Sequence, residues 1–247
     1  MSESKFDANE IIAWSAQLPL VHVNRETYLR SQFDRYCNEE LLERVLVLGP
    51  VQAGIPKKTI ALVAKSAINH ETAMVTLIST AVGIPGGLAM FGTVPGDIIQ
   101  FHGAMIRISQ KLAYIHGWPE LLENQGKNID DETRGLMLVF LGVMYGVAGA
   151  AGALEEIASH VAAATTKKIV TSALTKGSVY PVIQKISKAV GITMTKRLLA
   201  NGVGKAIPIV GGLVSGAITF ASFKPMANRL NVHLLKRTTA KRRSSAK

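Results

Sequence analysis

Acidic residues are absent from the end of this sequence. Aspartate and glutamate stop at Glu156, and none occurs in the 91 residues that follow. Residues 1–156 hold 12 basic and 17 acidic residues, a net charge of −5, whereas residues 157–247 hold 16 basic residues and no acid, a net charge of +16. A segment without carboxylates cannot form internal salt bridges. Its positive field must face lipid headgroups, nucleic acid or the acidic part of the chain.

Cysteine is nearly absent too. Cys37 has no partner for an internal disulfide and forms no metal cluster, which favours a reducing, cytoplasmic setting. The stretch MSESKFDANE lacks a basic region followed by an apolar run, so no secretory signal is predicted.

The six histidines lack metal-site spacing. No HxxxH or HExxH occurs, and His102 and His116 are too far apart along one helix, at about 1.5 Å per residue, to share an ion. We therefore predict no metal and no cofactor, and we expect the histidines at the surface or at helix ends.

Strand alternation and fixed-period repeats are also missing. The apolar pattern predicts an all-α protein, a glycine-rich multi-helix bundle with no significant sheet. We expect an N-terminal helical extension over residues 1–56, a main helical domain over 57–230 and a basic tail over 231–247.

Capping residues place several helix boundaries. Helices are predicted from Asp7 to about Gln17, from Asn24 or Glu26 to Tyr36, over NEELLERVLVL up to Gly49, and over residues 57–82 with a break at Asn69-His70. The clearest helix is capped by Asp97, with Gln100 three residues later, and ends at Gly117. Its apolar positions are Ile98, Phe101, Met105, Ile108, Leu112 and Ile115.

The stretch GIPGGLAMFGTVPGD, residues 83–97, has no lysine for a phosphate loop and follows no strand. We interpret it as a packing corner that breaks a helix. Residues 72–96, 135–154 and 206–223 are neutral and close to the roughly 20 residues needed to span a bilayer. Their glycines, prolines and flanking acids favour buried helices, with reversible membrane insertion as the alternative.

No linear catalytic motif is present. GxSxG does not occur, and Asp97 and His102 are five residues apart, a poor spacing for contact on a helix. Because catalytic groups can also assemble in space, Asp97, His102, Arg107 and Tyr145 form a candidate polar pocket that would support an enzyme.

The acid-free half contains only three aromatic residues, so nucleic acid is not an expected partner. Val182, Ile186, Val190, Met194 and Leu198 instead form an apolar ladder beside basic residues. This pattern is typical of a helix on an anionic membrane surface, although a solvated charged face has the same pattern. The predicted lipid-binding residues are Lys185, Lys188, Lys196, Arg197 and Lys205.

PGDIIQFHGAMIRISQKLAYIHGWPEL resembles the signature block of the EcsC family of bacterial proteins, in which Pro-x-Asp opens a helix that ends in Tyr-x-x-Gly. GIPGG, GLMLVFLGVMYGVAGAAGA and KAIPIVGGLVSGAITF are similar to that family's glycine-rich blocks, so the resemblance covers about residues 57–230. It implies an all-helical protein without established catalytic residues. The founding member is encoded beside an ABC transporter.

The sequence thus predicts a non-enzymatic cytoplasmic protein, peripheral to the inner face of the membrane. Its expected partners are anionic membrane lipids and a membrane protein, which it would assist as an accessory of a membrane machine. Two alternatives stay open: an enzyme acting on a lipid or apolar substrate among the glycine-rich helices, and a membrane-inserting toxin or effector. The oligomeric state is open as well.

Overall fold

The computed structural model describes residues 7–18, 20–82, 96–122, 129–163, 179–204 and 220–235. Within these ranges, only the backbone is described for residues 78–82, 96–97, 160–163 and 192–204. The described chain is 80% helical and contains no strand, which confirms the predicted all-α class.

The first helices begin at the predicted caps. α1 (Ala8–Ala16) follows Asp7, α2 (Arg25–Phe33) follows Asn24, and α3 (Glu39–Leu48) follows Asn38. Each of these side chains accepts a hydrogen bond from a backbone N–H of the first turn, which satisfies a donor that the helix itself leaves unpaired. The short 3₁₀ turn η1 (Asp34–Tyr36) extends α2, and Gly49 ends α3 with a φ of +82°.

Two long helices come next. α4 (Lys57–Val82) has the predicted bounds but continues through Asn69-His70, so the predicted break is wrong. α5 (Gly96–Ile115) begins one residue before Asp97, which makes Asp97 the second helical residue and not the cap. The chain leaves α5 at Gly117 as predicted, with a φ of +86° that glycine adopts without steric cost.

α6 (Asp131–Tyr145) ends at Gly146, whose φ is +75°, and α7 (Ala150–Ala163) follows after a short turn. The neutral segment 135–154 is therefore divided between two helices, and residues 135–144 are buried as predicted. Segment 72–96 lies partly, and segment 206–223 mostly, outside the described residues. Within the described part of the chain, no helix has both the length and the hydropathy that a bilayer crossing requires.

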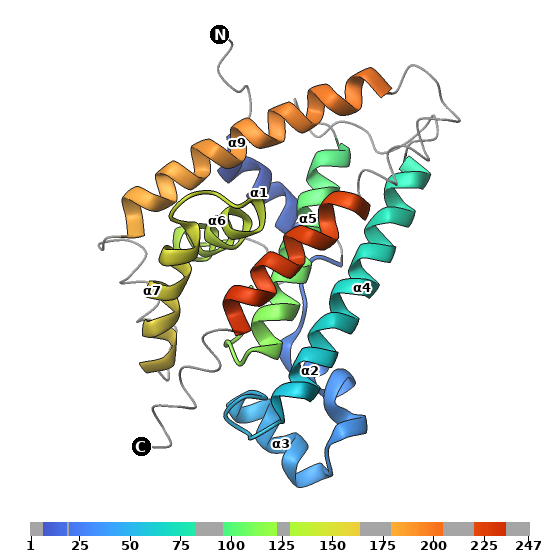
Figure 1. The fold of residues 1–247 in the computed structure, drawn as a ribbon, viewed down its shortest axis with the longest axis vertical. Helices are drawn as coiled ribbons and strands as arrows, with labels where there is room; N and C mark the ends of the chain where they lie inside the picture. The colour runs from blue at the N-terminus through green and yellow to red at the C-terminus, as the bar shows by residue number, and fades with distance from the viewer. Residues whose placement is uncertain are drawn as a thin grey trace.

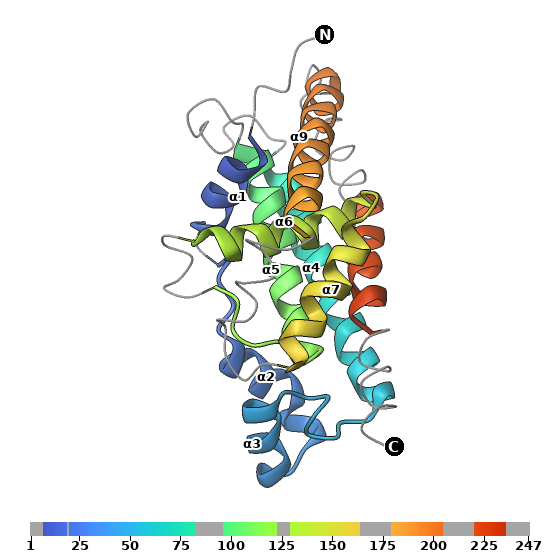
Figure 2. The ribbon, with the colours of Figure 1, turned by 90° about the vertical axis from the view of Figure 1, so that its left-hand side faces the viewer.

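α4 and α5 run side by side along the molecule (Figure 1). α2 and α3 lie at one end, and α9 (Val179–Gly204) crosses the other end (Figures 1 and 2). α1 and α6 both pack on α5, and α6 also contacts α7 and α9. α1 therefore shares the core of the main helices, although the boundary predicted at residue 56 stays a prediction.

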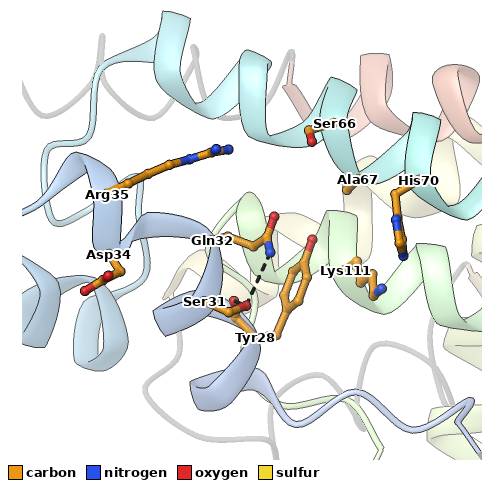
Figure 3. Close-up of a pocket in the computed structure, with 9 residues that line it drawn as sticks. All are labelled: Tyr28, Ser31, Gln32, Asp34, Arg35, Ser66, Ala67, His70 and Lys111. Carbon is orange, nitrogen blue, oxygen red and sulfur yellow. Dashed lines mark hydrogen bonds between the residues drawn. The ribbon is translucent and has the colours of Figure 1, made fainter.

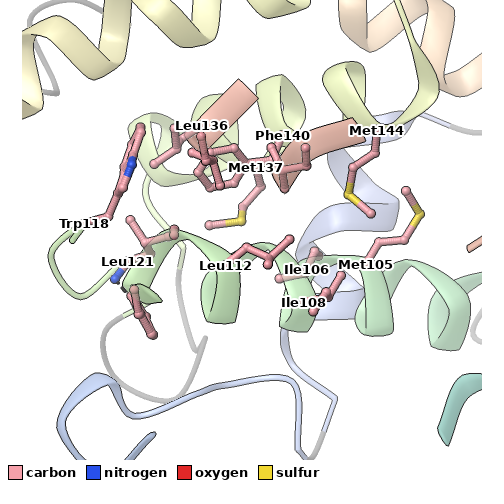
Figure 4. Packing of buried hydrophobic residues seen from close by; sticks show 14 of the residues in the cluster. Met105, Ile106, Ile108, Leu112, Trp118, Leu121, Leu136, Met137, Phe140 and Met144 are labelled. Carbon is pink, nitrogen blue, oxygen red and sulfur yellow. Dashed lines mark hydrogen bonds between the residues drawn. The ribbon is translucent and has the colours of Figure 1, made fainter. Parts of the chain in front are cut away.

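Buried apolar side chains fill the space between α5 and α6 (Figure 4), where Met105, Ile108 and Leu112 face Met137 and Phe140. All six predicted apolar positions of α5 are buried, which confirms its helical period. A last helix, residues 220–235, packs on α5 through Phe223, whose ring centroid lies 5.9 Å from that of Phe101. It continues past residue 230, where the basic tail was predicted to begin.

Candidate functional site

The structure brings together two of the four predicted pocket residues. His102 Nε2 lies 2.8 Å from the Tyr145 hydroxyl, and His102 Nδ1 lies 2.8 Å from the carbonyl oxygen of Ile98. Because a carbonyl only accepts, Nδ1 carries the proton, and in the neutral ring Nε2 accepts from Tyr145. His102 is only 1% exposed, so the prediction that it lies at the surface or at a helix end is wrong.

For His116 the prediction of a surface or helix-end position is met, because this residue directly follows the end of α5. His116 is buried, and its Nε2 lies 2.8 Å from Oδ1 of Asn231 in the helix 220–235. Because the amide oxygen accepts, Nε2 is the protonated nitrogen. Burial lowers the pKa of His116, partly opposed by the hydrogen bond to Asn231, so this imidazole is neutral at pH 7.

Arg107 belongs to a different cluster, and the side chain of Asp97 lies outside the described residues. The Arg107 guanidinium donates from Nε to Oε2 of Glu71 at 2.7 Å, and Lys111 Nζ donates to Oε1 at 2.5 Å. The Glu71 side chain is 2% exposed, against 15% and 16% for its two partners. One buried carboxylate therefore faces two cations, which leaves the cluster with a net charge of +1.

Sequence reasoning missed Glu71, although a signal for it exists. The buried positions of α4 follow the helical period, and Glu71 occupies one of them, between Ile68 and Val75. A carboxylate at a core position requires a cationic partner, because burying an unpaired charge is very costly. Arg107 and Lys111 are four residues apart on α5 and therefore present both cations on one face.

Tyr28 of α2 lies beside this cluster. Lys111 Nζ is 5.4 Å from the centroid of the Tyr28 ring. The Tyr28 hydroxyl is buried and has no hydrogen-bond partner among the residues that the structure describes. Burial, and secondarily the negative charge of Glu71, raise the pKa of Tyr28 well above its usual range. The hydroxyl therefore remains protonated and can donate.

A cavity of about 500 Å³ opens at this point between α2, α4 and α5 (Figure 3). Small-molecule pockets measure roughly 300–1,000 Å³, so the cavity is of ligand size. Figure 3 shows Arg35 reaching in from one side, and His70 and Lys111 from the other. The lining residues, none of which the sequence analysis selected, are Tyr28, Ser31, Gln32, Asp34, Arg35, Ser66, Ala67, His70 and Lys111.

Gln110 fixes the position of α2 against α5. Its Oε1 accepts from the backbone N–H of Val23 at 3.2 Å, and its Nε2 donates to the carbonyl oxygen of Val21 at 2.8 Å. The buried amide thereby forms hydrogen bonds with both a backbone N–H and a backbone carbonyl of the segment just before α2. This connection sets the distance between the two helices that carry Tyr28 and Lys111.

Two of the five predicted lipid-binding residues have described side chains. Lys185 and Lys188 are exposed on α9. Lys196 and Arg197 lie in the part of α9 whose side chains are not described, and Lys205 lies outside the described residues.

The apolar ladder of α9 faces the protein where its side chains are described. Ile186 and Val190 are buried, and Val182 packs against the same core. A Cβ placed on Gly142 of α6 would lie 2.6 Å from Cγ2 of Ile186, so the two helices are in close contact. The prediction that this side of the helix rests on a membrane is therefore wrong for these three positions.

The described residues contain no group of three or more His, Cys, Asp or Glu side chains placed to hold a metal ion. No family model, curated protein or solved structure matches the chain.

Proposed function

We propose that this protein is a non-enzymatic, peripheral membrane-associated protein of the cytoplasm that binds anionic lipid through its acid-free half and assists a membrane machine. Membership of the EcsC family is part of the proposal and is supported by the sequence blocks quoted above. The observation that carries the proposal is the confinement of every carboxylate to residues 1–156.

The described side chains of α9 support an electrostatic contact. Lys185 and Lys188 point to solvent on the face opposite the buried Ile186 and Val190. Tyr180, at the start of the same helix, is 50% exposed, and tyrosine is enriched where proteins meet the membrane interface. Because the apolar side of α9 is used in the core, its lysines would contact headgroups without insertion of the helix.

Vesicle sedimentation tests this proposal. Binding to phosphatidylserine vesicles should fall steeply as salt rises, because exposed charges are screened within about 10 Å at 0.1 M ionic strength. Basic residues near an anionic surface contribute about 1 kcal/mol each, so the double variant K185Q/K188Q should bind about 30-fold more weakly at low salt.

The double variant K57Q/K58Q is the matched control, since it removes the same charge from exposed lysines in the acidic part of the chain. It should bind vesicles almost as the unmodified protein does. Equal, salt-independent binding to phosphatidylcholine vesicles would contradict the proposal.

A further inference from the structure

We propose that the cavity between α2, α4 and α5 binds a phosphate ester, either a soluble phosphorylated polyol or the headgroup of a phospholipid. The site is formed by residues 28–111. It is therefore separate from the acid-free half and does not depend on the function proposed above.

The charge of the lining favours an anion. Arg35 and Lys111 approach the cavity from opposite sides (Figure 3). Glu71 neutralises only one of its two cationic partners, so Lys111 reaches the cavity from a cluster with an excess positive charge. Among the described residues of the lining Asp34 is the one carboxylate, and Figure 3 shows it turned away from Lys111 and His70.

The Tyr28 hydroxyl is the second, independent observation. It is a buried donor that lacks a partner among the described residues, and it points into the space between α2 and α4 (Figure 3). A buried polar group without a hydrogen bond is costly, whereas a charged acceptor beside it forms one of the stronger kinds of hydrogen bond. An oxygen of an anionic ligand next to Lys111 would supply that acceptor.

The number of donors and the size of the cavity favour a phosphate ester over a bare anion. Tyr28, Lys111 and Arg35 come from three separate elements, and a phosphate presents three acceptor oxygens where a carboxylate presents two. A volume of about 500 Å³ leaves room for a further group beyond the phosphate. Hydroxyls and an amide line the remaining wall, through Ser31, Ser66 and Gln32, and these suit a polyol.

Calorimetric titration of the full chain with sn-glycerol 3-phosphate tests the site. Saturable 1:1 binding is expected, and Y28F and R35Q should each weaken it about tenfold or more, because each loses a hydrogen bond to a charged group. Y180F and R44Q are the matched controls, since both residues are exposed and lie outside the lining, and their dissociation constants should stay within about twofold of that of the unmodified protein.

Two further titrations identify the source of the phosphate. Dihexanoyl phosphatidic acid that binds tenfold more tightly than glycerol 3-phosphate would assign the site to lipid, and equal or weaker binding would assign it to soluble esters. The proposal is overturned if neither compound binds at millimolar concentration, if succinate binds as tightly as both, or if Y28F and R35Q bind like their controls. A thermal melt checks that Y28F is folded, and its melting temperature should not be lower than that of the unmodified protein.

Discussion

The hydroxyls of Tyr28 and Tyr114 are both buried but differ in their partners. Tyr114 accepts from the backbone N–H of Leu121 at 3.1 Å, whereas Tyr28 has no partner among the described residues. Removing a satisfied buried group leaves its partner unpaired and costs about 1–3 kcal/mol. Y114F should therefore lower the free energy of unfolding by that amount, and Y28F should leave it unchanged or raise it. Urea unfolding measures the free energy of unfolding of both variants. Similar losses in Y114F and Y28F would contradict the difference in hydrogen bonding between the two hydroxyls.

Substitution of Glu71 should lower the free energy of unfolding more than substitution at most other single positions. Breaking a buried ion pair by removing one charge costs about 3–5 kcal/mol, because the partners stay buried and unpaired. E71Q should approach this loss, since Arg107 and Lys111 would face each other without a carboxylate. Arg30 pairs with Glu39 and Glu43 on the surface, and R30Q should change stability little. Chemical denaturation measures both variants. If E71Q and R30Q lower the free energy of unfolding equally, the buried ion pairs of Glu71 do not stabilise the fold more than the exposed ion pairs of Arg30.

The burial of His116 predicts that the stability of the fold depends on pH. Its folded pKa lies below the usual value of about 6.5, so as pH falls through that value the unfolded chain binds the proton first. The contribution is constant above about pH 7, and stability is lost below it until the lowered folded pKa is reached. H116Q should remove up to about 1.4 kcal/mol per pH unit from the slope of stability below pH 6.5. Denaturation at pH 7.5 and 5.5 tests this, and identical slopes would show that His116 does not contribute.

At the scale of elements, two helical glycines make a matched pair. An added Cβ at Gly142 would meet Cγ2 of Ile186 at 2.6 Å and Cβ of Ala150 at 3.1 Å, whereas at Gly152 it would meet nothing within 4 Å. Overpacking costs about 1–3 kcal/mol, and glycine in a helix costs up to about 1 kcal/mol relative to alanine. G142A should lower the melting temperature and G152A should raise it. If both variants instead raise the melting temperature, α6 and α9 can move apart enough to make room for the added methyl group.

The helices with the strongest local signals are the ones that the sequence predicts well. α4 has the predicted bounds, and all six apolar positions expected in α5 are buried, because periodicity and terminal glycines act within a few residues. The start of α5 differs by one residue from the position of its predicted cap.

The candidate site depends on contacts between distant parts of the chain. Glu71 meets Arg107 across 36 residues, and Gln110 meets Val23 across 87. Single-helix periodicity places each residue on a face but does not say which face meets which. For this reason the predicted group of Asp97, His102, Arg107 and Tyr145 combined members of two different clusters.

At the scale of the whole molecule, the absence of acidic residues after Glu156 predicts how residues 236–247 contribute to vesicle binding. This segment carries six basic residues and no acid. Its contribution to vesicle binding should be purely electrostatic, so its deletion should weaken binding at low salt and have little effect at high salt. Sedimentation with phosphatidylserine vesicles across a salt series measures both. If the deletion abolishes binding while K185Q/K188Q binds normally, the contact lies in this segment and not on α9.

The packing of α1 on α5, α6 and α9 also affects synthesis. The ribosome makes α1 about 80 residues before α5 begins, which at 5–20 residues per second is a delay on the order of ten seconds. Throughout that interval Ile11, Ile12 and Ala16, all fully buried in the finished protein, lack the surfaces of α5, α6 and α9 on which α1 packs. The growing chain therefore carries a short apolar helix without its packing partners for far longer than helices take to form.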